Sequence, residues 1–309
     1  MFERKKFRLR LASRTLMLGE RTLIMGVLNV TPDSFSESGL HFDTEAAVAR
    51  AFEIEAQGAD IIDIGAESTR PGSEPISAQE ELWRLLPVLA RLQGKLKIPI
   101  SVDTCKFEVA DAAADSGAEI LNDVTGLRHD PRIAAVARRR KIPLVLMHMR
   151  GEPRTMQKGP FARDVIRDVI PGLRRAATIA QRAGVAKSQI ILDPGIGFGK
   201  SYPQNYELLA RLPELARLGY PVLIGTSRKG FIGRALDDVP VAGRIWGTAA
   251  TVAASILGGA HIVRVHDVAE MVQVARVTDA ILNPKSIAAQ AQLKREKQRR
   301  KAKHKKQAQ

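Results

Sequence analysis

The sequence predicts a (β/α)8 barrel, the TIM-barrel class of α/β fold, and three observations lead to this prediction. Eight short runs rich in Val, Ile and Leu recur along the chain, and segments with helical spacing of apolar residues separate them. The runs are apolar throughout, as strands buried on both faces of a parallel sheet must be. Eight such units occupy roughly 260 residues, the usual size of this barrel. A doubly wound open sheet is the structural alternative, but no Gly-x-Gly-x-x-Gly follows the first strand.

The predicted strands cover residues 22–29 (TLIMGVLN), 60–65 (DIIDIG), 98–103 (IPISVD), 119–123 (EILND), 143–148 (PLVLMH), 189–193 (QIILD), 221–226 (PVLIGT) and 261–266 (HIVRVH). The segments between them include TEAAVARAFEIEAQGA, SAQEELWRLLPVLARLQGK and NYELLARLPELARLG. Each has apolar residues at helical spacing, and several end at Gly, the usual helix stop.

The chain divides into three predicted parts. Residues 1–20 are expected to form a short β-hairpin that caps the bottom of the barrel, and residues 21–283 form the barrel itself. Pro284 is expected to end the last helix. Residues 284–309 are then a basic C-terminal tail, predicted to be disordered because it lacks apolar periodicity.

The net charge of +15 is concentrated in this tail. Residues 294–309 contain nine Lys or Arg and one Glu, which is +8 and leaves +7 for the other 293 residues. One interpretation is a solvated tail that aids solubility, and the alternative is weak binding to nucleic acid or another anionic surface. The tail has no aromatic residue on which a base could stack, which weakens the alternative.

Composition also bears on the compartment. No apolar stretch approaches the ~18–20 residues of a membrane span, and the basic start MFERKKFRLRLASRTL lacks the features of a secretion signal. A single cysteine, Cys105, excludes an internal disulfide and is expected to pack rather than act as a nucleophile. We therefore expect a cytoplasmic protein.

A polar residue stands at or just past the carboxyl end of every predicted strand. These residues are Asn29, Asp63, Asp103, Asn122, His148, Asp193, Ser227 and His266. Any one of them could be an ordinary turn or helix-capping residue. All eight together predict a site at the carboxyl end of the barrel, where barrel enzymes build their active sites.

The loops add cations around this predicted site. Ser227, Arg228 and Lys229 follow the seventh strand, Arg264 and His266 end the eighth, and ESTRPGSEP (residues 67–75) follows the second. Barrels often bind phosphate beside strands seven and eight. Carboxylates and an amide deeper in the mouth suit a flat heterocycle rich in N–H donors. The pattern indicates a nitrogen heterocycle joined to a phosphate or pyrophosphate.

The sequence contains a segment that looks like a phosphate-binding P-loop and several histidines that could suggest a metal site, but neither prediction holds. DPGIGFGKS (residues 193–201) has Pro194 where a phosphate-binding P-loop needs its first glycine, so its glycines are expected to allow close approach to a flat ligand or a sharp turn. His41, His129, His261 and His304 have no metal-binding spacing. By contrast, the long polar loop within MGVLNVTPDSFSESG (residues 25–39) exceeds an ordinary connection and is predicted to be a lid.

The chain also carries, in order, MGVLNVTPDSFS, GADIIDIGAESTRPG, IPISVDT, ILNDVTG, LMHMRGEPRTMQ, ILDPGIGFGK, GTSRKGFIG and RVHDV. Together these segments resemble the dihydropteroate synthase family over residues 21–283. The resemblance implies an enzyme of folate biosynthesis, a transferase of a pterin-methyl group. It would condense 6-hydroxymethyl-7,8-dihydropterin pyrophosphate with p-aminobenzoate, with Mg²⁺ as cofactor. The alternatives are a pterin-dependent methyltransferase acting on methyltetrahydrofolate, or a non-catalytic pterin-binding barrel with a nucleic-acid-binding tail.

The resemblance assigns the site residues as follows. The pterin would be bound by Asp103, Asn122, Met147, Asp193, Gly225, Lys229 and Arg264. Pyrophosphate would contact Asn29, Arg70, Arg264 and His266, with Mg²⁺ on Asn29. The p-aminobenzoate pocket would contain Phe35, Thr69, Pro71, Phe198 and Ser227. The catalytic set would be Asn29, Asp33, Lys229, Arg264 and His266. The family also implies a homodimer formed through the later helices.

Overall fold

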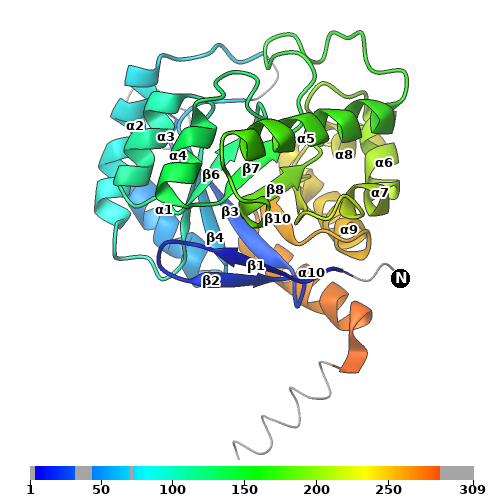
Figure 1. Cartoon of the computed structure of the whole chain (residues 1–309). Helices are drawn as coiled ribbons and strands as arrows, with labels where there is room; N and C mark the ends of the chain where they lie inside the picture. The colour runs from blue at the N-terminus through cyan, green and yellow to red at the C-terminus, as the bar shows by residue number, and fades with distance from the viewer. Residues whose placement is uncertain (1–3, 32–43, 70–71, 286–309) are drawn as a thin grey trace, which may run out of the picture.

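A barrel of eight parallel strands, surrounded by helices, forms the body of the molecule (Figure 1). The computed structural model describes residues 4–31, 44–69 and 72–285. The barrel strands are β3 (Leu23–Asn29), β4 (Ile61–Gly65), β5 (Ile100–Asp103), β6 (Ile120–Asp123), β7 (Leu144–Met147), β8 (Ile190–Asp193), β9 (Leu223–Ile224) and β10 (Ile262–Val265). Each lies within a range predicted from the sequence.

The helices follow the strands in alternation. They are α1 (Thr44–Ala56), α2 (Ala78–Leu92), α3 (Phe107–Asp115), α4 (Ile133–Arg140), α5 (Val165–Arg182), α6 (Tyr202–Ala210), α7 (Leu212–Ala216), α8 (Gly230–Ala235), α9 (Ile245–Leu257) and α10 (Val268–Leu282). The described parts of the chain also contain two short 3-10 helices, η2 (Lys187–Gln189) and η3 (Val241–Arg244). Local sequence fixes several helix starts: Ser77 Oγ accepts a hydrogen bond from Glu80 N at 3.1 Å, and Asp164 caps α5 in the same way.

The strand order β8-β7-β6-β5-β4-β3-β10-β9 runs around the barrel. A parallel bridge between Leu192 and Val222 joins β8 to the start of the β9 segment, and Leu192 N donates to Pro221 O at 2.9 Å. These contacts close the ring. The predicted TIM barrel is therefore confirmed, with its narrowest seam at the two-residue strand β9.

An antiparallel hairpin of β1 (Phe7–Arg10) and β2 (Thr15–Leu18) lies across the amino-terminal end of the barrel (Figure 1). Leu9 and Leu18 are fully buried there against the first inward-pointing side chains of the strands, including Met25 and Ile61. The hairpin is thus the predicted cap. The exact boundary of each predicted part of the chain stays a prediction.

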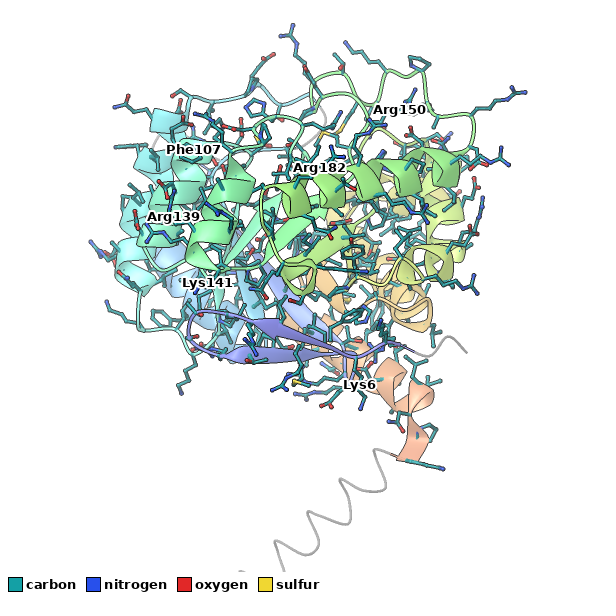
Figure 2. The ribbon with its side chains drawn as sticks, in the orientation of Figure 1. Lys6, Phe107, Arg139, Lys141, Arg150 and Arg182 are labelled. Atoms are coloured by element: carbon teal, nitrogen blue, oxygen red, sulfur yellow. The ribbon has the colours of Figure 1, made fainter. Side chains whose placement is uncertain are left out.

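The outward face of the barrel packs against the helices. Ile62, Val102 and Leu146 belong to one continuous cluster that includes Leu85 of α2 and Leu173 of α5. Both faces of the strands are therefore buried, as the apolar runs predicted. Basic side chains such as Arg139, Lys141 and Arg182 project outward from this helical layer (Figure 2).

Helix α10 ends at Leu282, two residues before Pro284, as expected. Pro284 and Lys285 are helical again, so helical structure resumes at the proline, a residue that is well suited to the first position of a helix. Residues 286–309 lie outside the described residues. In the parts of the chain that the structure describes, no helix is long and apolar enough to span a membrane.

Candidate functional site

The period of two along a β-strand places the polar residues inside the barrel mouth. An apolar inward layer near the hairpin includes Ile61, Ile120, Ile191 and Ile262. Two positions later on the same strands come Asp63, Asn122, Asp193 and Arg264. Side chains two residues apart point to the same face. On these four strands, the step from an isoleucine layer to a layer of charged and amide side chains therefore occurs within one repeat of two residues.

A pocket opens at this charged layer. Its lining includes eleven of the residues that the sequence assigned to the site: Thr69, Asp103, Asn122, Met147, Asp193, Phe198, Gly225, Ser227, Lys229, Arg264 and His266. The pterin set predicted from the sequence is thus present in full in one cavity, together with three residues of the predicted p-aminobenzoate pocket.

Charged side chains connect the floor of this pocket. Arg264 Nε lies 2.6 Å from Asp63 Oδ2, and Arg264 Nη2 lies 2.9 Å from Asp103 Oδ2. Asp63 is fully buried and also accepts hydrogen bonds from Ser101 Oγ at 2.6 Å and Asn122 Nδ2 at 3.1 Å. Asp63 therefore holds Arg264 and Asn122 from beneath, a role that the sequence did not assign to it.

The electrostatics of the floor follow from its burial. Burial raises the pKa of Asp103, and the Arg264 guanidinium offsets this only in part. Burial would lower the pKa of Arg264, but Asp63 and Asp103 outweigh it and the pKa lies above its usual value. Arg264 is thus a permanent cation that partly neutralises a site in which carboxylates are costly to ionise.

Asp193 and Lys229 form the opposite side of the pocket. Asp193 Oδ1 accepts a hydrogen bond from Gly195 N at 2.7 Å, and burial raises the pKa of Asp193 against the effects of that N–H and Lys229. Burial lowers the pKa of Lys229 to about 7. The Lys229 ammonium donates to Ile196 O and lies 4.0 Å from the centroid of the Phe198 ring. Its polar contacts in this state are with the loop after β8.

Of the two explanations expected for the glycines of that loop, the sharp turn fits their backbone conformation. Gly195 and Gly199 have φ of +66° and +67°. A Cβ at either position would lie 2.0 Å from a carbonyl oxygen, that of His148 and that of Arg150 respectively. They therefore also allow the loop after β8 to pack against the backbone of the loop after β7.

Several predicted residues lie away from the pocket lining. Asn29 ends β3, half-buried and outside the lining set, and His148 faces Lys200 and Asp168 instead. Arg228, expected on the phosphate rim, pairs with Asp267 through two hydrogen bonds. The predicted residues Asp33, Phe35, Arg70 and Pro71, together with the lid loop, lie outside the described residues.

Three lining residues were not predicted from the sequence: Val124, Gly195 and Ile196. The last two belong to DPGIGFGKS, from which the sequence assigned only Asp193 and Phe198 to the site by residue. Val124 follows the predicted Asn122 by two positions and joins Met147 and Met149 in an apolar wall beside Phe198. Its signal would have been the same period of two that placed Asn122 inside.

Cys105 lies outside the pocket lining. Burial raises the pKa of the Cys105 thiol to about 12, which makes it a poor nucleophile. Among the described residues, no group of three or more His, Cys, Asp or Glu is arranged to hold a metal ion.

The fold and the pocket agree with a comparison to known families. The family described as "Pterin binding enzyme" matches residues 25–266, more than half of the chain. The protein is thus a pterin-binding barrel enzyme.

Curated relatives narrow this class. A dihydropteroate synthase of Synechocystis sp. is 49% identical over 263 residues, covering 85% of this chain and 91% of that protein. One of Bacillus subtilis is 48% identical over 264 residues, covering 85% and 90%. The solved structure of the Xanthomonas albilineans dihydropteroate synthase with 4-aminobenzoic acid superposes with a TM-score of 0.84 at 42% identity, covering 90% of this chain and 99% of that one. The chain belongs to the dihydropteroate synthase family.

Proposed function

We propose that this chain condenses 6-hydroxymethyl-7,8-dihydropterin pyrophosphate with p-aminobenzoate to give 7,8-dihydropteroate and pyrophosphate. The observation that supports this most directly is one pocket that joins an acidic floor, made of Asp103, Asn122 and Asp193, to the cations Lys229 and Arg264. The alternative of a methyltransferase is disfavoured because the curated relatives above are synthases.

The floor would recognise the pterin. Carboxylate oxygens of Asp103 and Asp193 accept hydrogen bonds from ring and amino N–H groups, and the Asn122 amide can both donate and accept. Lys229 would leave Ile196 O to donate to a ring acceptor, while Met147 and Gly225 line the pocket beside the ring. Arg264, now paired with Asp63 and Asp103, would cover the ring face when the pterin displaces part of that pairing.

The rim would hold the pyrophosphate. Arg264 and His266 reach the mouth from the end of β10, and the His266 ring Nδ1 lies 3.0 Å from Ser227 Oγ. Arg70 is proposed as a further cation from the loop after β4. These positive groups would stabilise the charge that develops on the leaving group.

Asn29 is proposed to hold Mg²⁺. Its amide oxygen is the kind of ligand that Mg²⁺ prefers, and this cation commonly takes only one or two protein ligands besides phosphate and water. Bound Mg²⁺ would supply counter-charge for the departing pyrophosphate.

In this reaction the protein mainly positions the two substrates, because no protein nucleophile takes part. The bond between the pterin methylene carbon and the pyrophosphate oxygen breaks, and its electron pair leaves with pyrophosphate. The ring stabilises the resulting cation, and the amine nitrogen of p-aminobenzoate attacks it and then loses a proton. Thr69, Phe198 and Ser227 would place that amine. Pro71 would line the same pocket, and a lid that carries Asp33 and Phe35 would keep water from trapping the cation.

We further propose a homodimer in the cytoplasm. Leu257 at the end of α9 and Val277 and Ile281 near the end of the neighbouring α10 are exposed apolar residues, with 63% of Val277 accessible. Apolar residues gathered on adjacent helices are typical of a subunit interface. The single cysteine supports a reducing compartment.

The decisive experiment is an assay of pyrophosphate release with and without p-aminobenzoate, with dihydropteroate identified as product. We expect product only when both substrates and Mg²⁺ are present. Methyl transfer from methyltetrahydrofolate to a corrinoid partner, without condensation, would refute the proposal. Pterin binding without either reaction would instead favour the non-catalytic alternative.

A further inference from the structure

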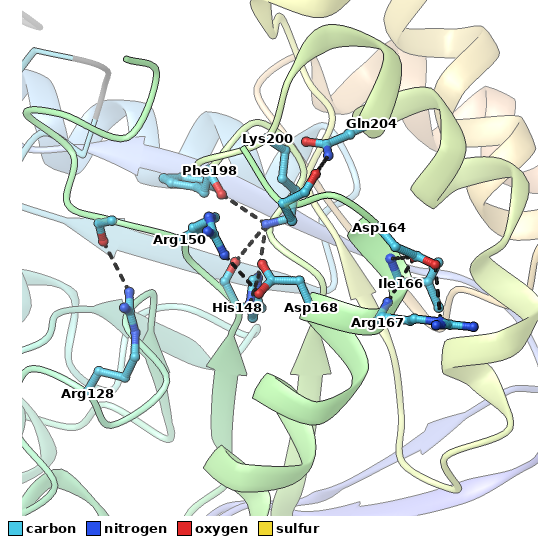
Figure 3. A network of polar contacts seen from close by, with 12 residues as sticks. Arg128, His148, Arg150, Asp164, Ile166, Arg167, Asp168, Phe198, Lys200 and Gln204 are labelled. Carbon is cyan, nitrogen blue, oxygen red and sulfur yellow. Dashed lines mark hydrogen bonds and ion pairs between the residues drawn. The ribbon is translucent and has the colours of Figure 1, made fainter. Parts of the chain in front are cut away.

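Lys200 is a buried lysine behind the pocket that the chemistry above does not use. It follows the glycine loop after β8, and only 2% of it is accessible to solvent. Its Nζ lies 2.9 Å from Phe198 O, 3.1 Å from His148 O and 3.2 Å from His148 Nδ1 (Figure 3). An ammonium has three N–H donors, so these three acceptors use all of them. Lys200 joins the loop after β7 to the loop after β8.

The His148 side of this junction is rigid. Burial and the nearby cations, Lys200 first among them, lower the pKa of His148 to about 2, so its neutral ring can accept at Nδ1. Its Nε2 lies 3.6 Å from Asp168 Oδ2, and Arg150 Nη1 lies 3.1 Å from Asp168 Oδ1 (Figure 3). A Cβ at Gly172 of α5 would lie 2.5 Å from the ring, so the helix packs directly on the imidazole.

The Phe198 side of the junction lines the pocket. Lys200 binds the carbonyl of Phe198 from behind, while Lys229 lies against the Phe198 ring from the pocket side. Lys229 also donates to Ile196 O, but under the proposed function this donor is needed by the pterin. Once Lys229 turns to the substrate, Lys200 Nζ still holds the carbonyl of Phe198.

Strand pairing sets the position of the pterin floor, although the charge of Lys200 also acts on the Asp193 carboxylate. Asp193 belongs to β8, where its carbonyl accepts from His148 N at 2.9 Å and its carboxylate from Gly195 N. Backbone pairing of the strands therefore places Asp193, whereas Phe198 lies five residues beyond the end of the strand. The two halves of the pocket are fixed by different means.

We propose that Lys200 is a positioning residue that fixes Phe198, and with it the p-aminobenzoate half of the pocket, without touching either substrate. This inference rests on the proposed function. It identifies what holds the second-substrate half of the site in place.

The test replaces Lys200 with Met, which keeps the apolar stem and removes all three donors. We expect the KM for p-aminobenzoate to rise up to about tenfold, because without the Lys200 hydrogen bonds Phe198 is less well positioned. The KM for the pterin substrate should rise less, because strand pairing still places Asp193. Lys200→Gln keeps two N–H donors and should restore part of the affinity for p-aminobenzoate. Lys187→Met is the matched control, because Lys187 is exposed and its ammonium lies over the Tyr220 ring. It should change neither constant.

Each other outcome is informative. Equal rises in both KM values, or no rise in either, would overturn the role assigned to Lys200. If Lys200→Met does not fold, Lys200→Gln decides, and failure of both to fold would make Lys200 a general stability residue instead. If the unmodified protein forms no dihydropteroate, the proposed function fails, which is a different result from an unaltered KM in the variants.

Discussion

The two ends of the barrel are built on the same strands but are filled by different kinds of side chain. At the hairpin end, inward-pointing Ile and Leu residues meet Leu9 and Leu18 in a buried apolar layer. Two residues further along the strands, the same inward direction carries Asp63, Asn122, Asp193 and Arg264. The hairpin covers the first layer, whereas loops such as the one after β8 surround the second, so one set of strands supports an apolar and a polar end.

The closed end of the barrel contributes to stability, and the mouth contributes to function at some cost in stability. The mouth buries groups whose pKa values are shifted by desolvation, among them Asp193 and Lys229, and such burial costs free energy of folding. The closed end gains free energy because apolar area is removed from water there. We therefore expect substitutions at the hairpin end to lower the free energy of unfolding and leave catalysis intact. Substitutions at the mouth should impair ligand binding or catalysis without lowering the free energy of unfolding.

The largest expected effect is at the hairpin end. Leu18→Ala should lower the free energy of unfolding by about 2–5 kcal/mol, because it opens a cavity in a fully buried layer. Activity at a temperature where the variant is folded should be unchanged. Met17→Ala is the matched control, since the neighbouring side chain points the other way and is 40% exposed. Equal losses of stability from both substitutions, measured by urea unfolding, would show that the hairpin is not a sealed cap.

The next effect belongs to the mouth. Asp193→Asn replaces an acceptor oxygen with a donor and removes a charge, at a cost of about 1.5–3 kcal/mol for a buried charged hydrogen bond. Affinity for a pterin analogue, measured by calorimetry, should fall roughly tenfold or more. Asp237→Asn, at an exposed residue in the loop after α8, serves as the control. An unchanged affinity in the Asp193 variant would remove Asp193 from the pterin site.

A smaller effect should appear in the pH dependence of stability. Burial lowers the pKa of Lys200 from 10.5 to about 7, with Asp193 and Asp168 opposing the shift and Lys229 and Arg128 adding to it. Between these values the unfolded chain binds a proton that the folded protein does not, so the free energy of unfolding rises with pH. The stability of the protein relative to Lys200→Met should therefore rise by up to about 1.4 kcal/mol per pH unit from about pH 7 upward. A flat difference would mean that Lys200 keeps its proton throughout this range.

Much of this architecture could be predicted because it follows from local pattern. Asp63 and Asn122 could be placed at the mouth from strand ends and a period of two. The range 221–226 was predicted too long, because the regular pairing there covers only Leu223–Ile224, where the barrel closes. Contacts made between loops could not be predicted, such as Arg228 with Asp267 or Lys200 with Phe198. These contacts depend on how separate β/α units pack against one another. The spacing of residues within one unit carries no information about that packing.

The smallest effect is expected from the C-terminal tail, which belongs to neither end of the barrel. The last core residues in the described part of the chain, Met271, Val272 and Ala275, lie on α10, well before residue 294. Residues 294–309 contain nine Lys or Arg and no aromatic or branched aliphatic residue, so they have little apolar surface to bury. Truncation after Leu293 should therefore leave the melting temperature and turnover nearly unchanged. It should also remove any weak, salt-sensitive binding to polyanions, since such binding scales with the number of cations engaged. Loss of activity or a changed oligomeric state in the truncated protein would show that the tail packs on the barrel, and would add a third region to the comparison between the two ends.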